Sequence, residues 1–289
     1  MTYKFGVIGV GTWGEQHLKT ISTHPHCELA MICDLNEDLV KQRAREYGAK
    51  AWTTDYQEVL ADPDIAAVSV VTPDHVHREI TVATAQAGKH MLIEKPLATT
   101  VEDCEAILSA ARKNDVKIMV DFHNRFNTPF VNAKRAIEDG EIGQPQMMSV
   151  RLNDTVFVPT EMLSWGGKST VAWFLASHAV DLIRWLFEDE VVRVYSVSRS
   201  RVLEKMGITT PDFFHSILEL QNGGVAHVEN CWIMSPSMPT VFDFKLELIG
   251  EEGTLFADLS GHRMLQKYTA NEAVYPDCIG SPLVHGRYV

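Results

Sequence analysis

A lysine flanked by a glutamate and a proline is the residue in this chain best suited to proton transfer. Lys95 follows an apolar run, 90–93, that is typical of a buried strand, and it stands between Glu94 and Pro96. At the carboxyl end of such a strand, its ammonium would point into a ligand crevice. Burial and a neighbouring positive charge both lower the pKa of a lysine, which can then donate or accept a proton near neutral pH. We therefore interpret Lys95 as catalytic.

Two further polar clusters follow predicted strands. One is Thr72–His77 and the other is His123–Phe126. Because the carboxyl ends of parallel strands meet at one edge of a sheet, we expect both clusters at the ligand edge. Other interpretations stay open: Asp74 could cap the next helix, and His75 and His77 could be ordinary surface residues. Two histidines two positions apart, without a carboxylate or cysteine cluster, are a weak metal signature, so we predict no metal site.

A glycine-rich turn joins the first predicted strand to a helix. Gly9 permits the tight turn, Gly11 lets backbone N–H groups approach a pyrophosphate, and Gly14 lets the helix pack closely on the strand. Thr12 and Trp13 belong to the same turn, near the start of the helix. The pyrophosphate would bind at the N-terminus of that helix, where unpaired N–H groups and the helix dipole favour negative charge. The turn therefore predicts a dinucleotide site.

An acidic residue ends the second predicted strand. Residues 29–33 form the strand and Asp34 follows it, about twenty residues after the glycine turn. A carboxylate there would accept hydrogen bonds from an adenosine ribose and repel a 2′-phosphate. The sequence thus predicts NAD as the cofactor, with NADP disfavoured.

The elements that position these residues alternate between strands and helices up to residue 122. Apolar strands over 66–71, 90–93 and 117–122 are separated by helical patterns, which lie at 36–47, 56–60, 77–87 and 101–114. Strands without polar alternation indicate a parallel sheet covered on both faces. We therefore predict an α/β Rossmann domain over residues 1–122.

The pattern changes in residues 123–289. Helices are expected at 129–138 and 171–186, and strands at 147–152, 191–197, 213–221, 225–232, 242–249 and 255–258. This order predicts a second domain of the α+β class, with a largely antiparallel open sheet and helices on one side, for substrate binding and oligomerisation. Arg151, His215 and His227 fall in these strands, and alternation alone does not decide which face they occupy.

Composition limits the classes of partner. The chain has 289 residues with 45% hydrophobic content, enough for two domains. Its net charge of −12 argues against nucleic acid or an anionic membrane as partner. The sequence shows no signal-peptide pattern and no apolar stretch long enough to span a bilayer. Five scattered cysteines, Cys27, Cys33, Cys104, Cys231 and Cys278, suit reduced thiols, so we expect a cytoplasmic protein.

Taken together, the motifs resemble those of the glucose–fructose oxidoreductase/inositol dehydrogenase family. The resemblance rests on the glycine turn, Thr72-Pro73, Glu94-Lys95-Pro96, the cluster at 123–126, and His178-Ala179-Val180-Asp181 followed by Arg184-Trp185. It runs in order over nearly the whole chain. It implies an NAD(P)-dependent oxidoreductase that acts on CH–OH groups of a sugar, cyclitol or related polyol, assembled as a homodimer or homotetramer.

The resemblance also implies roles for individual residues. Lys95 would contact substrate and nicotinamide, with a proline bond that is often cis in the family, and His178 would transfer the proton beside the reacting hydroxyl. Trp165 and Trp173 could stack on a sugar ring, or could belong to the core. Expected cofactor contacts beyond the glycine turn and Asp34 are Thr72, Pro73, His75, Glu94, Lys95 and Asn124. Expected substrate contacts are Lys95, His123, Arg125, Trp165, Trp173 and His178.

Two features depart from the family pattern. The family's helix carries an aspartate four residues before the histidine, where this chain has Phe174. The chain also ends sooner than family members generally do, which suggests a shortened or incomplete member. Two alternatives therefore stay open: a reductase that uses NAD(P)H on a ketone or imine, and a cofactor-binding regulatory protein without catalysis.

Overall fold

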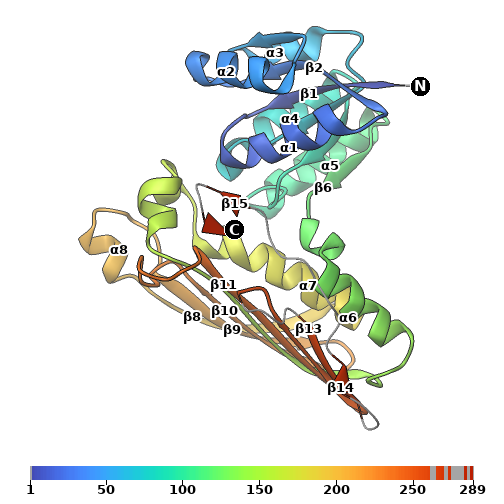
Figure 1. Cartoon of the computed structure of the whole chain (residues 1–289), viewed down its shortest axis with the longest axis vertical. Helices are drawn as coiled ribbons and strands as arrows, with labels where there is room; N and C mark the ends of the chain where they lie inside the picture. The colour runs from blue at the N-terminus through green and yellow to red at the C-terminus, as the bar shows by residue number, and fades with distance from the viewer. Residues whose placement is uncertain (1, 261–264, 270–272, 275–282, 285–286, 289) are drawn as a thin grey trace. The chain divides into compact units, whose positions relative to one another are not determined.

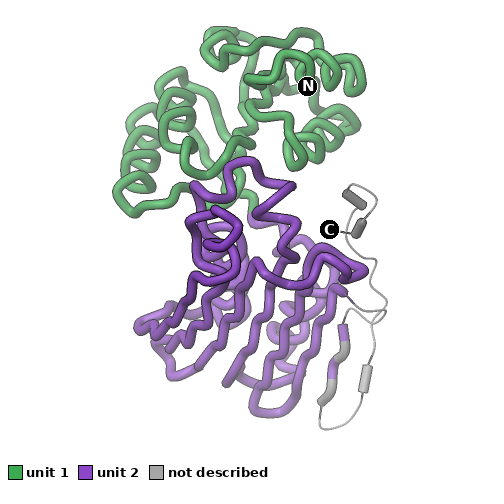
Figure 2. Tube along the Cα trace, turned by 90° about the vertical axis from the view of Figure 1, so that its left-hand side faces the viewer, with its two compact units in different colours: residues 1–121 green, residues 122–289 purple. Residues whose placement is uncertain are grey.

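The computed structural model describes residues 2–260, 265–269, 273–274, 283–284 and 287–288, and Figure 1 shows the chain. The chain divides into two compact units, residues 1–121 and residues 122–289. Figure 2 colours them separately. Each is described by itself below.

A parallel sheet of six strands forms the centre of the first unit, in the order β3-β2-β1-β4-β5-β6. Its strands are β1 (Tyr3–Ile8), β2 (Cys27–Cys33), β3 (Ala51–Thr53), β4 (Ala67–Val70), β5 (His90–Ile93) and β6 (Ile118–Val120). Val7 and Ile8 are neighbours on β1 but belong to different apolar clusters, because successive side chains point to opposite faces. The sheet is thus buried on both faces, and the predicted Rossmann fold is confirmed.

Helices cover both faces of this sheet. They are α1 (Thr12–Thr23), α2 (Glu37–Tyr47), α3 (Tyr56–Ala61), the 3₁₀ turn η1 (Asp74–Val76), α4 (His77–Gln86) and α5 (Val101–Lys113). Side-chain caps start several of them: Asn36 accepts from the N–H of Leu39, and Thr100, the expected cap of α5, accepts from the N–H of Asp103. The short β3 was not predicted from the sequence.

A mixed, mostly antiparallel sheet of eight strands forms the second unit, in the order β14-β13-β12-β11-β7-β10-β9-β8. Only β7 and β10 in its centre run parallel among the described pairs. The strands are β7 (Pro145–Asp154), β8 (Val191–Arg199), β9 (Phe213–Leu220), β10 (Val225–Cys231), β11 (Phe242–Gly250), β12 (Gly253–Asp258), β13 (Leu265–Thr269) and β14 (Ala273–Val274); β15 (Leu283–Val284) and β16 (Arg287–Tyr288) pair separately. The predicted fold class is confirmed.

Helices α6 (Thr128–Glu138) and α7 (Ser177–Phe187) lie along one face of this sheet (Figure 1). Leu182, Ile183 and Leu186 of α7 are fully buried in one large core that includes the inward residues of β7, Met148 and Val150. The remaining short elements are η2 (His123–Phe126), η3 (Val158–Met162), η4 (Gly166–Lys168), η5 (Ala172–Ala176) and α8 (Val202–Lys205).

The single helix predicted over 171–186 is wrong in its first turns. Residues 172–176 form the π-helical segment η5, and regular α-helix begins at Ser177. The Ser177 hydroxyl donates to the carbonyl of Trp173 at 2.9 Å, a side-chain bond that competes with the regular ladder. Such π segments inside helices occur frequently at functional sites.

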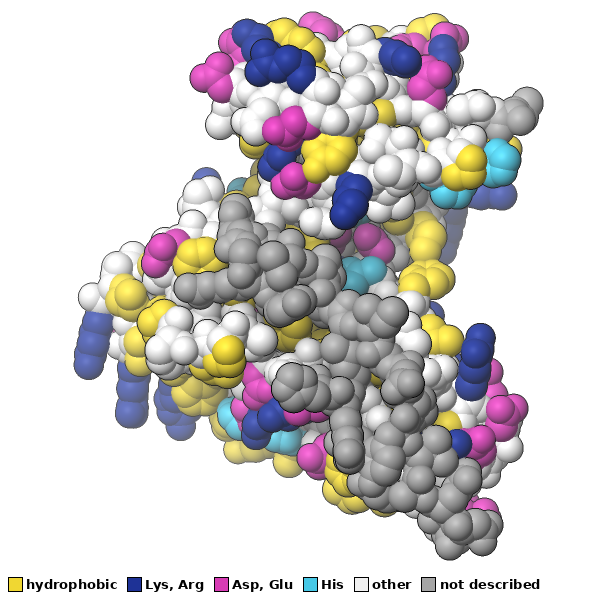
Figure 3. Space-filling model, in the orientation of Figure 1, with side chains coloured by type: hydrophobic (Ala, Val, Ile, Leu, Met, Phe, Trp, Pro, Cys, Tyr) yellow, Lys and Arg dark blue, Asp and Glu magenta, His cyan; other side chains and the backbone are white. Residues whose placement is uncertain are grey.

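Charged side chains of both signs are interspersed on the face of the first unit drawn in Figure 3. Ion pairs of the first unit include Lys4 with Asp64 at 2.7 Å and Arg78 with Asp103 at 3.0 Å. Among the described helices, none is both long and apolar enough to cross a membrane. The four described cysteines are free thiols, and Cys278 lies outside the described residues.

Candidate active site

Of the three glycines in the turn, the fold requires Gly9 and Gly14 but not Gly11. A Cβ on Gly9, whose φ is +92°, would lie 2.3 Å from the carbonyl oxygen of Val71, and one on Gly14 would lie 2.2 Å from that of Gly9. Both would collide with backbone. A Cβ on Gly11 would meet no described atom within 4 Å. The chain itself thus leaves open space at Gly11, where a pyrophosphate would approach.

The start of α1 suits an anionic group. Gly11 is the N-cap of the helix, and no side chain caps it. The helix dipole favours negative charge beside the N–H groups of this first turn. These features fit a dinucleotide pyrophosphate at the predicted place.

Asp34 joins the turn to the second strand. One carboxylate oxygen accepts from the N–H of Val10 and the other from the N–H of Asn36, both at 2.9 Å. The carboxylate therefore stands beside the glycine turn, with acceptor capacity left for ribose hydroxyls, since each oxygen can accept two hydrogen bonds. Its position fits the predicted preference for NAD.

Lys95 is buried, with 8% of its surface exposed, and Glu94 beside it is buried at 7%. The Lys95 N–H donates to the Glu94 carboxylate at 3.1 Å, and the Lys95–Pro96 peptide bond is cis, as the resemblance implied. The segment directly follows β5, as expected. The buried position predicted for the lysine is thus found, and its catalytic role stays a prediction.

A histidine that sequence reasoning missed lies behind this segment. His17 of α1 places Nε2 at 3.0 Å from a Glu94 oxygen and 3.4 Å from an Asp121 oxygen, while Nδ1 lies 2.7 Å from the Ser69 hydroxyl. His17 stands three residues after Gly14, and that spacing was the only sequence signal. Its partners come from three different strands' ends, which only the fold brings together.

The cluster that follows β4, Thr72–His77, contains two buried polar side chains, Asp74 and His77. His77 is fully buried, so its interpretation as a surface residue is wrong. Its two ring nitrogens lie 2.8 Å from the carbonyl oxygens of Pro96 and Thr72. Asp74 is buried in η1, the turn that leads into α4, and its role as a helix cap stays a prediction. His75 is partly exposed, and its cofactor contact, like those of Thr72 and Pro73, stays a prediction.

In the second unit, His178 lies near the start of α7. It is buried, and its ring meets that of His123 edge to face, with centroids 4.9 Å apart. Asn124, in η2 beside His123, is buried at 6%. The fold therefore brings His123 and His178 together, and their shared role in substrate binding stays a prediction.

Arg125 is committed to a partner within the chain. Its guanidinium donates to both carboxylate oxygens of Asp181, at 2.8 and 2.6 Å, and lies 5.8 Å from the ring centroid of Trp185. This bidentate pair fastens η2 to α7, because such geometry fixes both side chains. Both carboxylate oxygens of Asp181, one turn after His178, thus accept hydrogen bonds from Arg125. A substrate contact by Arg125 stays a prediction.

Phe174, which replaces the family's aspartate, belongs to an aromatic cluster. Its ring centroid lies 6.2 Å from that of Trp165 and 5.7 Å from that of Trp232, and it is 8% exposed. Trp165 is partly buried against the core, whereas Trp173 is 41% exposed. Of the two tryptophans predicted to stack on sugar, Trp173 thus has more free surface.

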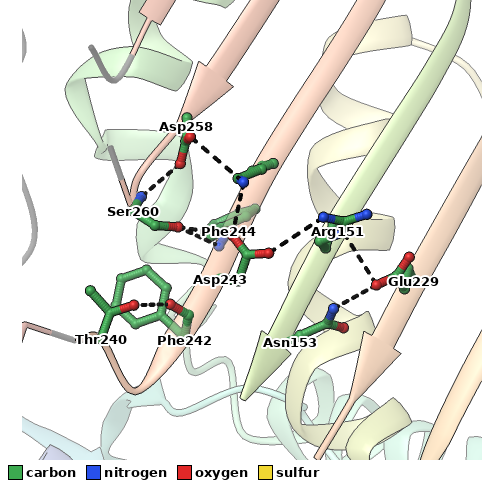
Figure 4. A network of polar contacts seen from close by, with 10 residues as sticks. Arg151, Asn153, Glu229, Thr240, Phe242, Asp243, Phe244, Asp258 and Ser260 are labelled. Carbon is green, nitrogen blue, oxygen red and sulfur yellow. Dashed lines mark hydrogen bonds and ion pairs between the residues drawn. The ribbon is translucent and has the colours of Figure 1, made fainter. Parts of the chain in front are cut away.

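The strand residues left undecided by alternation lie on the face opposite α7. Val150 and Leu152 point into the core, so Arg151 between them faces outward, and it pairs with Glu229 at 3.2 Å and Asp243 at 3.6 Å (Figure 4). His215 and His227 share that outer face, with ring nitrogens 3.3 Å apart. These three residues therefore lie on the other side of the sheet from His178.

One thiol close to the cofactor site is excluded from chemistry. Burial, with Asp34 adding to it, raises the pKa of Cys33 to about 12. The thiol stays protonated near neutral pH and is a poor nucleophile. Cys33 instead packs in one of the apolar clusters of the first unit.

Two family models match the chain. The model described as "Oxidoreductase family, NAD-binding Rossmann fold" covers residues 3–122, and "GFO/IDH/MocA C-terminal domain" covers residues 130–256. Together they span both units.

Similar proteins include inositol dehydrogenases. The chain is 31% identical over 261 residues to scyllo-inositol 2-dehydrogenase (NAD(+)) of Bacillus subtilis, covering 89% of this chain and 74% of that protein. It is 27% identical over 256 residues to myo-inositol 2-dehydrogenase of Thermotoga maritima, covering 88% and 75%. Among solved structures, levoglucosan dehydrogenase in complex with NADH and levoglucosan is similar with a TM-score of 0.86 and 27% identity, covering 98% of this chain and 81% of that one.

Proposed function

The chain belongs to the glucose–fructose oxidoreductase/inositol dehydrogenase family, and we propose that it moves hydride between NAD and a hydroxyl-bearing carbon of a sugar, cyclitol or related polyol. It is an NAD-dependent dehydrogenase that acts on CH–OH groups, which confirms the predicted family, enzyme class and cofactor. The class of polyol is our proposal, supported by relatives that act on inositols and levoglucosan.

The observation that carries the proposal is the buried Lys95 in the unit that holds the cofactor turn. A lysine ammonium loses hydration when it is buried, so it is retained inside a protein only where it has a task or a partner. An amine held in place can donate or accept a proton, which suits acid–base work on an alcohol.

Bound NAD supplies the hydride acceptor. In the oxidative direction, Lys95 would accept the proton of the substrate hydroxyl as hydride leaves the carbon, and His178 stays a second predicted proton-transfer residue. A positioned acid–base group of this kind contributes roughly 10²- to 10⁴-fold in rate. Since Phe174 stands where the family's aspartate would orient His178, Lys95 carries more of the proton transfer in our proposal.

A panel of polyols offered with NAD tests this function. We expect NADH formation with at least one of myo-inositol, scyllo-inositol and levoglucosan, and loss of that turnover in Lys95→Ala. The exposed Lys113 on α5 gives a matched control, Lys113→Ala, that should keep full activity. NAD binding without turnover on a broad panel of polyols and of ketones with NADH would favour the regulatory alternative.

We also propose that the outer face of the second unit's sheet joins copies of this chain into a homodimer or homotetramer. Neighbouring strands place apolar side chains there that are 40–67% exposed: Met147, Tyr195, Ile217, Val225 and Ile249. The ion-pair network around Arg151 lies on the same face (Figure 4). An apolar patch rimmed by charge is typical of a subunit contact.

Light scattering tests the assembly. The parent protein should have the mass of two or four chains, and Ile217→Lys should lower it towards one chain. Val101→Lys, at an exposed position of the first unit, is the control and should leave the mass unchanged. A parent that is monomeric at micromolar concentration would exclude this interface.

A further inference from the structure

His77 connects two loops of the cofactor unit from a fully buried position. Its Nδ1 lies 2.8 Å from the carbonyl oxygen of Pro96, and its Nε2 lies 2.8 Å from the carbonyl oxygen of Thr72. Both partners are acceptors only. The ring donates an N–H to a carbonyl oxygen and lies 2.8 Å from both oxygens, so one buried side chain joins the two loops.

We propose that His77 is a positioning residue that ties the loop after β4 to the segment after β5 and so fixes Lys95 in place. The inference deepens the proposed function and rests on it for the role of Lys95. The tie reaches Lys95 through its neighbour Pro96, and it holds Thr72 with the same ring. A shift of about 1 Å in a reacting group can cost on the order of 100-fold in rate, so such a tie matters for catalysis.

A second histidine holds the same segment one residue earlier. His17 faces the Glu94 carboxylate at 3.0 Å through Nε2, which must carry a proton because a carboxylate only accepts. The other Glu94 oxygen accepts the Lys95 N–H. The Glu94–Pro96 segment is thus fixed at its first residue by His17 and at its last by His77, with Lys95 between them.

The hydrogen bonding of His77 can be observed directly in the cofactor-free protein. With ¹⁵N-labelled histidine, we expect a His77 ring N–H that exchanges slowly with solvent, because the ring is buried and donates to a carbonyl oxygen. The N–H of the exposed His26 ring should exchange rapidly. His77→Gln assigns the signals by removing them. A His77 ring N–H that exchanges as fast as that of His26 would overturn the tie.

A double-mutant cycle with Lys95 tests the positioning role. We expect His77→Gln and His17→Gln each to lower kcat on the active polyol roughly 10- to 100-fold, with His26→Gln as the unchanged control. In a Lys95→Ala background, neither change should lower the residual rate further. Circular dichroism and NADH fluorescence titration establish that each variant is folded and binds cofactor.

The outcomes separate the inference from the function beneath it. If Lys95→Ala keeps full activity, the proposed role of Lys95 fails while the nitrogen signals still report on His77. If Lys95→Ala is inactive but His77→Gln and His17→Gln keep full kcat, the positioning role is refuted. Should His77→Gln not fold, His17→Gln and the nitrogen signals of the parent decide.

Discussion

The two units hold their candidate proton-transfer residues in different ways. Lys95 follows a parallel strand, and the residues on each side of it are fastened by hydrogen bonds to His17 and His77. His178 stands on a helix whose place is set by the packing of Leu182, Ile183 and the aromatic cluster around Phe174. The comparison teaches that the position of Lys95 in the first unit depends on a few polar contacts, whereas that of His178 in the second unit depends on a hydrophobic core.

The largest expected effect is on stability. Phe174→Asp tests whether hydrophobic packing holds α7 in the second unit. The change removes a ring from between Trp165 and Trp232 and buries a carboxylate there, so we expect a loss of about 3–5 kcal/mol in the free energy of unfolding. Urea unfolding measures it. Trp173→Asp, at the exposed neighbouring position, should cost far less. Equal stability of the two variants would break the comparison, since α7 would then not depend on this cluster.

Substitutions in the glycine turn of the first unit separate its effect on stability from its effect on NAD binding. Gly14→Ala places a methyl group 2.2 Å from the Gly9 carbonyl oxygen, so we expect a loss of about 1–3 kcal/mol in stability together with loss of NAD binding. Gly11→Ala meets open space and should keep its stability but bind NAD weakly. Thermal unfolding and NADH titration measure the two properties. Tight NAD binding by Gly11→Ala would contradict the placement of the pyrophosphate.

Asp34→Ala should change the choice of cofactor. It removes a ribose acceptor and the repulsion of a 2′-phosphate, so we expect NAD affinity to fall roughly tenfold while NADP affinity rises. Parallel titrations of both cofactors measure the ratio. Asp38→Ala, on the exposed side of α2, is a control that should leave it unchanged. A parent that binds NADP more tightly than NAD would refute the predicted preference.

The smallest expected effect is on the pH dependence of stability. It comes from replacing His227, on the outer face of the second unit's sheet. Burial lowers its pKa, and the neighbouring His215 and Arg151 add to the shift against Glu229. The unfolded chain then binds this proton more readily than the folded one, so stability is lost as the pH falls through about 6.5. His227→Gln should flatten that loss in unfolding curves between about pH 7 and pH 5. His90→Gln, at an exposed histidine, should leave the loss of stability unchanged. If the parent, His227→Gln and His90→Gln all lost stability equally as the pH falls, the lowered pKa of His227 would be contradicted.

What the sequence could predict follows from how local each signal is. The glycine turn, Asp34 and Lys95 were found because strand, turn and helix follow one another in the chain. The short β3 gave no pattern long enough to detect. The π-helical start at 172–176 depends on hydrogen bonds that helical periodicity does not encode. His17 and His77 were missed or left open because their partners, Glu94 and Pro96, are distant in the sequence and meet only through the order of the strands.

Gly11 illustrates how differently two kinds of selection would see the same turn. A screen for folded protein would tolerate alanine at this position, because the chain supplies nothing for a methyl group to strike. A screen for growth on a substrate would reject it, since the constraint comes from a molecule that is not encoded in the chain. Where those two screens disagree along the first unit, they would outline the bound dinucleotide without a ligand ever being seen.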